Sequence, residues 1–457
     1  MCPPIASRQT CAIICDDVAT RGRGLIVAAP GSGSGKTIVT LALLRLLARA
    51  GSETVAAKCG PDYIDSSFLA AASGRPCLNL DAWAMRPATL SRIVGDVSRG
   101  AFVLCEGAMG LFDGAEGGGG STADIAALTG WPVLLVVDAR GQGASAAAVV
   151  RGFVGLRPKT TIAGVVFNRV GGSRHESILR QAMERIVPGV PVLGFVPRDA
   201  RLALPERHLG LVQAQEHAEL GARLDAAADA IAPVLDLAAI TAIARTSSLA
   251  MTSGEPARPL PPLGQRIAVA ADTAFSFTYP AILAGWHAAG AEIIPFSPLA
   301  DEAPDETADA VYLPGGYPEL HAGKLAGNRR FLEGLRGAAH KRAAVFGECG
   351  GYMVLGRTLT DAGGLCHAMA GLLPVATSFA ERRLHLGYRQ VELVEPCALG
   401  EIGARFRGHE FHYATALGEG PGDPLFSVAD STGQSLHNAG WVDGSVAGSF
   451  IHLIDAA

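Results

Sequence analysis

The chain has 457 residues, of which 49% are hydrophobic and 18% charged, and its formal net charge is −5. This length exceeds what one hydrophobic core usually supports, so we expect two domains. The composition is that of a globular protein with large buried sheets and argues against disorder. The negative charge leaves no electrostatic footprint for nucleic acid or for an anionic membrane surface.

Cysteine content and the chain start indicate the compartment. Nine cysteines, an odd number scattered through a long chain, do not form a disulfide framework. No apolar run approaches the ~20 residues of a membrane span, and acidic Asp16 and Asp17 do not fit a signal peptide. We expect a cytoplasmic protein that binds neither membrane nor nucleic acid.

A phosphate-binding motif follows an N-terminal extension, residues 1–22, that shows no periodicity. Residues 24–29 form an apolar run typical of a buried strand, and residues 37–50 have apolar positions at helical spacing. Between them stands the sequence PGSGSGKT, residues 30–37. A strand, a Gly-rich loop, Gly-Lys-Thr and a helix make the P-loop arrangement.

In a P-loop, loop amides and the helix N-terminus cradle phosphate, the lysine reaches the β and γ oxygens, and the adjacent hydroxyl holds Mg²⁺. The predicted nucleotide-binding residues are Gly31, Ser32, Gly33, Ser34, Gly35, Lys36 and Thr37. Pro30 replaces the first glycine of the usual pattern. A flexible connection between strand and helix is the alternative, and Gly-Lys-Thr argues against it.

Four acidic residues are candidates for the same site. Asp62 and Asp65 stand beside a Gly-Pro turn, where they support Mg²⁺ or substrate or are ordinary turn formers. Glu106 ends the apolar strand 101–105, the position of a Walker-B-type metal ligand; a helix N-cap or a salt bridge is the alternative. Asp113 lies in a Gly-rich loop able to close over a site.

Further apolar runs at 132–137, 161–167 and 192–196 alternate with helical stretches. This alternation predicts a parallel sheet covered on both faces. Asn168 follows a strand at the rim where ligands bind, so we expect it to contact the nucleotide, with helix capping as the alternative.

Residues 243–264 carry four prolines and no periodicity, which marks a linker. Strands are predicted again at 266–271, 292–296 and 310–313, with a helix at 280–289.

The second half contains the sequence GECGG, residues 347–351, between a short apolar run and a possible helix start. Gly-x-Cys-x-Gly in this setting is the thiol form of a nucleophile elbow, whose glycines permit a tight turn. The helix N-terminus would favour the thiolate of Cys349. A structural cysteine in a Gly-rich turn is the alternative. The amides of Gly316 and Gly350 are candidate oxyanion donors.

A cysteine nucleophile needs a base. The candidates are His385, His409, His412, His437 and His452. We expect His452 to end an apolar strand, residues 448–452, where it could lean over the elbow. Any one histidine taken alone is more often structural than catalytic.

Together these stretches resemble the cobyrinic/hydrogenobyrinic acid a,c-diamide synthases of cobalamin biosynthesis. The resemblance runs from about residue 22 to the C-terminus. Besides the P-loop and the Cys349 elbow, it is carried by residues 60–65 (GPDYID), 79–81 (NLD), 106–114 (EGAMGLFDG), 207–211 (RHLGL), 274–277 (AFSF), 313–320 (LPGGYPEL) and 408–413 (GHEFHY).

The resemblance implies an α/β protein of two domains, each a mostly parallel sheet flanked by helices. A dethiobiotin-synthetase-like P-loop domain would span residues 23–242. A class I glutamine amidotransferase domain of flavodoxin type would span residues 265–457, after the linker 243–264.

The resemblance also implies that Cys349 attacks the amide of glutamine and that His452 is its base. Many class I amidotransferases carry a glutamate two residues after that histidine, where this chain has Ile454. The motif therefore leaves open what orients His452.

In the first domain, the resemblance implies that ATP phosphorylates a corrin carboxylate and that ammonia displaces the phosphate, at the a and c acetates in turn. A carboxylate reacts with ammonia only once its oxygen is a good leaving group, and phosphoryl transfer to an anion needs neutralisation by Mg²⁺ and lysine. Thr37, Asp62 and Glu106 are the expected metal ligands. Asp65 and Asp113 are expected to position substrate or to help deprotonate ammonia.

The nearest alternative is a related amidoligase, such as cobyric acid synthase or Ni-sirohydrochlorin a,c-diamide synthase, which differs in the tetrapyrrole and not in the chemistry. A P-loop partitioning or regulatory ATPase, and a glutaminase with a degenerate nucleotide module, are alternatives of other classes. We favour metal-free hydrogenobyrinic acid over cobyrinic acid as substrate. A homodimer is a hypothesis without a supporting motif.

Overall fold

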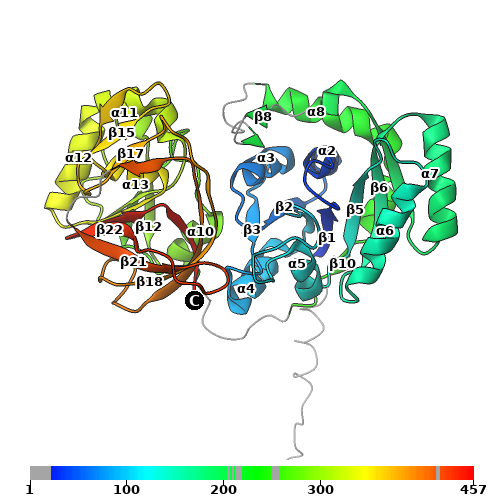
Figure 1. Ribbon diagram of the computed structural model, residues 1–457, viewed down its shortest axis with the longest axis horizontal. Coiled ribbons are helices and arrows are strands. Elements are labelled where there is room, and N and C mark those ends of the chain that lie inside the picture. Colours follow the sequence, from blue (N-terminus) through cyan, green and yellow to red (C-terminus); the bar gives the residue numbers. More distant parts are fainter. Residues whose placement is uncertain (1–21, 203–205, 208–209, 212–218, 250–257, 418–421) are drawn as a thin grey trace, which may run out of the picture. The chain divides into compact units, whose positions relative to one another are not determined.

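The computed structural model describes residues 22–202, 206–207, 210–211, 219–249, 258–417 and 422–457, which form two compact units (Figure 1). The second unit comprises residues 81–89, 114–119 and the described residues from 258 onward, and the first unit holds the rest. Except for Gly22, the predicted extension lies outside the described residues, as do His208 and Leu209. No helix in the described ranges is long and apolar enough to span a membrane.

The first unit is built on a sheet with the strand order β3-β2-β4-β1-β5-β6-β7, in which every neighbouring pair along this order is parallel. Its strands are β1 (Arg23–Ala28), β2 (Thr54–Cys59), β3 (Leu78–Leu80), β4 (Phe102–Glu106), β5 (Val133–Asp138), β6 (Ile162–Val170) and β7 (Val192–Pro197). The strands are apolar and mostly buried because helices cover both faces.

The helices of this unit follow the strands in alternation. They are α2 (Lys36–Arg49), α3 (Ile64–Ser73), α4 (Pro87–Val97), α5 (Thr122–Thr129), α6 (Ser145–Leu156), α7 (Ser173–Ile186), α8 (Leu220–Ile231) and α9 (Leu237–Ala242). Helices α2, α3 and α8 pack together on one face of the sheet, and α4 and α5 lie on the other (Figure 1). Short β8 (Glu206–Arg207) and β9 (Gly210–Leu211) pair with each other.

The predicted linker, residues 243–264, begins with residues that belong to the first unit. There β10 (Arg245–Thr246) pairs antiparallel with the start of β1. The amide of Ser248 also donates to the carbonyl of Thr129, at 2.7 Å. Residues 243–249 therefore belong to the fold of the first unit and do not form a separate linker.

The second unit contains a sheet with the order β12-β11-β13-β14-β23-β22-β21-β18-β19-β24. Its parallel part is β11 (Arg266–Ala270), β12 (Glu292–Phe296), β13 (Ala310–Leu313), β14 (Ala344–Glu348) and β23 (Val446–Ser449). Its antiparallel part is β18 (His385–Leu393), β19 (Arg405–His412), β21 (Asp423–Ala429), β22 (Ala439–Asp443) and β24 (Ile451–Ala456).

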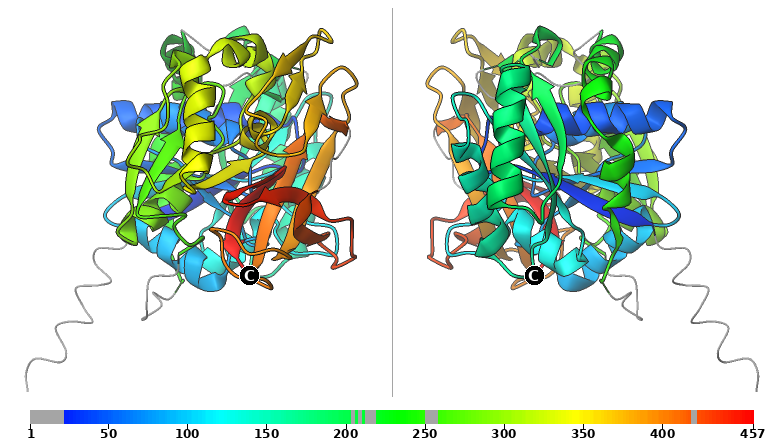
Figure 2. Two further views of the ribbon diagram at one scale, coloured as in Figure 1. Left: turned by 90° about the vertical axis from the view of Figure 1, so that its left-hand side faces the viewer. Right: turned by 90° about the vertical axis from the view of Figure 1, so that its right-hand side faces the viewer.

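Helices flank the parallel part of this sheet, while the antiparallel strands extend it (Figure 2). They are α10 (Pro280–Ala288), α11 (Ala322–Gly327), α12 (Arg329–His340) and α13 (Gly350–Leu355). A smaller sheet joins β15 (Thr358–Thr360), β16 (Cys366–Ala368), β17 (Ala376–Ser378) and β20 (Thr415–Leu417). The predicted two-unit α/β class is confirmed, and the antiparallel extension is a feature that the prediction did not contain.

Two short segments from the first half of the chain belong to the second unit. In residues 81–89, Trp83 stacks on Tyr388 with ring centroids 4.5 Å apart. Arg86 donates through Nη2 to Oδ1 of the buried Asp455, at 2.7 Å. Residues 114–119 form the second segment, and Ser431 Oγ donates to the carbonyl of Glu116 at 2.8 Å. The boundary between the units is therefore not a single point in the sequence.

Candidate functional site

The P-loop connects β1 to α2 with two glycines in left-handed backbone conformations. Gly33 has φ +76° and Gly35 has φ +85°, values that other residues rarely adopt. A Cβ at Gly35 would also lie 2.0 Å from Nδ2 of Asn168. The loop therefore needs glycine at position 35 both for its backbone and for the close approach of β6.

Asn168 and Arg169, in β6, hold this loop from the second strand beyond β1 in the sheet. Asn168 Nδ2 donates to the carbonyl of Ser34 at 2.9 Å, and Arg169 Nη1 donates to the carbonyl of Gly33 at 2.8 Å. The structure thus places Asn168 on the backbone of the predicted nucleotide loop. A direct contact between Asn168 and the nucleotide stays a prediction.

Lys36, Thr37 and Glu106 meet at the carboxyl end of the sheet. Glu106 is the last residue of β4 and pairs with Val27 of β1, which leads into the P-loop. Its Oε1 accepts from Lys36 Nζ at 2.8 Å and from Thr37 Oγ1 at 2.6 Å. Its Oε2 is buried and has no hydrogen-bond partner among the described residues. The three residues form one compact polar cluster.

Lys58, which sequence reasoning did not select, completes this cluster. It lies in β2 opposite Glu106, is only 1% exposed, and its Nζ lies 2.5 Å from Asp65 Oδ2 and 3.5 Å from Glu106 Oε1. Burial alone would lower the pKa of Lys58, but Asp65, Glu106 and Asp62 together raise it well above its usual value. A lysine inside an apolar strand was the signal for it, because a buried ammonium needs anionic partners.

Replacing Lys58 with methionine should destabilise the first unit by about 3 kcal/mol, because it leaves the buried Glu106 and the half-buried Asp65 without their shared cation. Hydrogen exchange of the β1, β2 and β4 amides, which reports on this unit alone, would measure the loss. Lys159→Met, at an exposed lysine, is the matched control. If the exchange rates of these amides were unchanged, the positive charge of Lys58 would not stabilise the unit.

Asp62 and Asp113 make local backbone contacts. Asp62 Oδ1 accepts from the amides of Ile64 (2.8 Å) and Asp65 (2.9 Å), so one of its oxygens caps α3. Asp113 Oδ2 accepts from the amide of Gly110 at 3.0 Å, in a loop whose Leu111 amide donates to the carbonyl of Ala29. This loop thus runs beside the P-loop, while Asp62 has the turn-forming contacts that the sequence left as an alternative.

The second candidate site surrounds Cys349, between β14 and α13. Cys349 has φ +46°, a strained conformation for a residue with a side chain. A Cβ at Gly351 would lie 2.0 Å from the carbonyl of Leu313, and a Cβ at Gly350 would lie 3.0 Å from the Gly316 amide nitrogen. The glycines are therefore required by the close approach of the loop after β13. That approach brings the two predicted oxyanion donors, Gly316 and Gly350, together.

The thiol of Cys349 is buried, at 2% exposure, and lies 3.8 Å from the carbonyl of Phe411, to which it donates. Burial raises the pKa of Cys349 well above its usual value, and the negative charge of Glu319 raises it further. The sulfur is therefore held as a thiol, and a nucleophilic role requires a base that accepts its proton.

His452 does not end a strand, contrary to the sequence prediction. It is the second residue of β24, because the chain bends between β23 and β24, where Ser449 Oγ accepts from the amide of Ile451 at 3.1 Å. The Cys349 amide donates to the carbonyl of Ser449 at 2.8 Å, which ties the elbow to this bend. A Cβ at Gly315 would lie 2.3 Å from Cε1 of His452. The imidazole thus packs against the predicted oxyanion loop.

The electrostatic surroundings keep the His452 imidazole neutral. Burial lowers its pKa to about 3, with contributions from His409 and His412 that outweigh the opposing effect of Glu410. A neutral imidazole can accept a proton from a thiol. His409 pairs with His452 across β19 and β24, and burial lowers its pKa to about 4.

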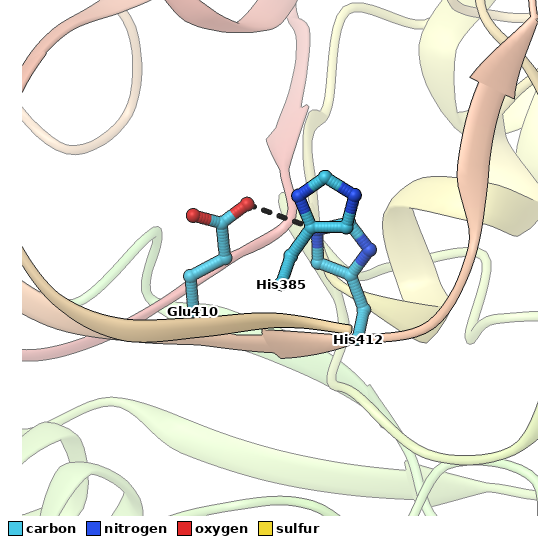
Figure 3. Close-up of side chains that lie close together, drawn as sticks. All are labelled: His385, Glu410 and His412. Carbon is cyan, nitrogen blue, oxygen red and sulfur yellow. Dashed lines mark hydrogen bonds and ion pairs between the residues drawn. The ribbon is translucent and has the colours of Figure 1, made fainter. Parts of the chain in front are cut away.

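His385 of β18 and Glu410 and His412 of β19 form a cluster (Figure 3). The rings of His385 and His412 stack with centroids 4.6 Å apart, and His412 Nε2 lies 2.9 Å from Glu410 Oε1. Their ligand atoms lie within 4.8 Å of one another, a spacing that a metal ion could use. However, Arg389 Nε donates to Glu410 Oε2 at 2.7 Å, so a cation already balances this carboxylate. The contacts fit an ion-pair cluster better than a metal site.

His437 is exposed and belongs to neither site.

Two family models match the chain. One is the CobQ/CobB/MinD/ParA nucleotide binding domain, over residues 25–212, and the other is the CobB/CobQ-like glutamine amidotransferase domain, over residues 266–457. The first range contains the P-loop and Glu106. The second contains Cys349 and His452.

Curated relatives match almost end to end. A hydrogenobyrinate a,c-diamide synthase of Brucella suis biovar 1 is 53% identical over 435 residues, 95% of this chain and 98% of the relative. Another, of Rhodobacter capsulatus, is 52% identical over 436 residues, 94% of this chain and 98% of the relative. Among solved structures, PurLQS from Thermotoga maritima matches with a TM-score of 0.31 at 18% identity, covering 41% of this chain and 87% of its own.

Proposed function

Since the chain belongs to the hydrogenobyrinate a,c-diamide synthase family, we propose that it amidates the a and c acetate carboxylates of hydrogenobyrinic acid with ATP and glutamine. The chain is a glutamine-dependent amide ligase of cobalamin biosynthesis, with a nucleotide-binding domain followed by a glutamine amidotransferase domain. The observation that carries the proposal is the presence, in one chain, of a P-loop cluster around Glu106 and a strained, buried Cys349 whose elbow, like the neutral His452, packs against the loop after β13.

The second unit would release ammonia from glutamine. As the thiol of Cys349 attacks the amide carbon, its proton passes to His452, and the amide nitrogen takes that proton as it leaves as ammonia. The amides of Gly316 and Gly350 would stabilise the oxyanion of the tetrahedral intermediate. Water then hydrolyses the thioester to glutamate, with His452 as its base.

The first unit would activate the corrin carboxylate. The P-loop amides and Lys36 would bind the phosphates of ATP, and a corrin carboxylate oxygen would attack the γ-phosphorus to form an acyl phosphate and ADP. Ammonia would then attack the acyl carbon and release phosphate. Lys58 and Asp65 lie beside Glu106, at the end of the sheet where the acceptor would be positioned.

The cluster also fits a magnesium ion, because the buried Glu106 Oε2 has no hydrogen-bond partner among the described residues and Thr37 lies next to it. Thr37 and Glu106 would hold Mg²⁺, with Asp62 as a further candidate, and the ion would neutralise the charge that develops on the phosphates. Asp113 remains a candidate for positioning substrate, in the loop beside the P-loop.

Competition between corrins would test the substrate. With Mg-ATP and glutamine, hydrogenobyrinic acid should be amidated at two carboxylates, with kcat/KM at least about tenfold above that for cobalt-containing cobyrinic acid. Mass spectrometry counts the amides, because each replaces a hydroxyl group with an amino group. Ni-sirohydrochlorin is the third substrate to compare, and preference for it or for cobyrinic acid would contradict the proposed substrate.

We further propose that the enzyme is a cytoplasmic homodimer that binds neither membranes nor nucleic acid, in keeping with its net charge of −5. Light scattering of the purified chain would give its assembly state.

A further inference from the structure

We propose that Glu348, the residue before the nucleophile, is the carboxylate that orients His452 and stabilises its protonated form. The proposal rests on the glutamine-hydrolysing function given above. It fills the role that position 454 leaves open, because Ile454 is an apolar side chain buried to 1% exposure.

Glu348 ends β14 with a fully enclosed carboxylate that bridges two strands. It is 2% exposed, and its Oε1 accepts from the amide of Leu453, next to His452, at 3.1 Å. Its Oε2 accepts from the hydroxyl of Tyr312 in β13 at 2.7 Å and lies 4.0 Å from Nδ1 of His452. One oxygen thus fixes the main chain beside the histidine, and the other faces its ring at ion-pair distance.

The position of the carboxylate has a direct chemical consequence. An anion facing Nδ1 favours the tautomer with the proton on Nδ1 and the lone pair on Nε2, the atom that would accept the thiol proton. When the proton arrives, the imidazolium forms next to a negative charge in a buried site, where the attraction is strong. Glu348, the residue before Cys349 in the elbow, would therefore position the base that serves Cys349.

The surrounding charged groups come from several elements. Tyr312 of β13 and His452 of β24 both face Oε2 of the carboxylate. On β19, His409 and His412 disfavour the imidazolium while Glu410 favours it, and Glu319 acts on the thiol of Cys349. Burial raises the pKa of Glu348 to about 7, with the bonds from Tyr312 and Leu453 opposing the rise.

Glu348→Gln tests the role, because the amide keeps the shape but loses the charge and can donate to Nδ1, which fixes the wrong tautomer. We expect glutamine hydrolysis to lose kcat by at least about 100-fold, with KM for glutamine within about threefold of wild type. Amidation with free ammonia should keep its wild-type rate. Glu348→Asp, which retains a carboxylate, should recover part of the lost kcat.

The pH dependence of glutamine hydrolysis separates the two roles, because a purely structural role of Glu348 would not change it. Wild-type kcat/KM for glutamine should fall as the pH drops below about 7, where Glu348 becomes protonated, and this acid limb should be absent from Glu348→Gln. The raised pKa means that the protonated carboxyl stabilises the fold at low pH and that this stabilisation is lost as the pH rises through about 7. At pH 8 the glutamine variant should therefore melt at or above the wild-type temperature.

Glu392→Gln, at a half-buried glutamate paired with Arg405, is the matched control and should behave as wild type. Glutamine hydrolysis by Glu348→Gln within threefold of wild type, or an unchanged acid limb, would overturn the proposal. A lower melting temperature with an equal loss of ammonia-dependent amidation would also overturn it, by showing a structural role. If wild-type enzyme hydrolysed no glutamine, the proposed function itself would fail.

Discussion

Replacing Cys349 with serine is expected to reduce glutamine-dependent amidation by at least about 1,000-fold and to leave amidation with free ammonia at the wild-type rate. The serine hydroxyl keeps the shape of the elbow but is a much weaker nucleophile at neutral pH than a thiol whose proton a base accepts. The first unit does not contain this residue, so activation of the corrin should continue. Coupled assays of glutamate, ADP and corrin amides, with each nitrogen source in turn, measure the two effects.

Cys366→Ser is the matched control, because Cys366 is an exposed free cysteine of the same unit. It should retain both activities. Glutamine-dependent amidation that survives in Cys349→Ser would refute the assignment of the nucleophile. Loss of the ammonia-dependent activity as well would indicate that the substitution damages more than the elbow.

Lys36→Ala is expected to remove amidation from both nitrogen sources, by about 100- to 1,000-fold, because the lysine supplies a positive charge where phosphoryl transfer develops negative charge. The substitution also leaves buried Glu106 without one of its two cations, although Lys58 Nζ remains 3.5 Å from it. The rate of ammonia-dependent amidation measures the effect. Covalent labelling of Cys349 by a glutamine analogue should be unchanged, which shows that the second unit is intact.

Lys159→Ala, at an exposed lysine of the same unit, should keep full amidation. If Lys36→Ala retained ammonia-dependent amidation near the wild-type rate, the P-loop would not be the site that activates the corrin carboxylate.

The parallel strands could be predicted from the sequence because each is a short apolar run between turn signals. The predicted strands 292–296 and 310–313 coincide with β12 and β13, and the run 24–29 is displaced by one residue from β1. Such strands are buried on both faces, so their hydrophobicity marks them directly. The P-loop could be located because its chemistry requires particular residues in a fixed order.

The antiparallel half of the second sheet could not be predicted in the same way. β18 and β19 carry charged and polar side chains such as Arg389, Glu410 and His412, and many of their positions are only half buried. Other polar side chains of these strands contact a distant segment: the Tyr388 hydroxyl donates to Asp81, and Arg407 donates to the carbonyl of Trp83. No local pattern in the sequence indicates such contacts. The bend at Ser449 likewise involves a side-chain hydrogen bond, so the apolar run 448–452 predicts one strand where the chain forms the end of β23 and the start of β24.

The candidate sites show the same limit. Sequence motifs indicated Lys36, Thr37, Glu106 and Cys349, because each stands in a recognisable local order. Lys58 and Glu348 acquire their partners only through pairing of strands far apart in the chain, Lys58 with Glu106 and Glu348 with the amide of Leu453. No spacing in the sequence encodes those contacts.

The central claim is that one unit releases nitrogen from glutamine while the other activates a carboxylate by phosphorylation. An isotope experiment tests it directly: wild-type enzyme with Mg-ATP, glutamine labelled with nitrogen-15 in its amide, and hydrogenobyrinic acid labelled with oxygen-18 in its carboxylates. The account predicts that each new corrin amide carries nitrogen-15 and that one oxygen-18 appears in inorganic phosphate for every amide formed. Amides that form without transfer of oxygen-18 to phosphate would contradict the acyl phosphate route and the account built on it.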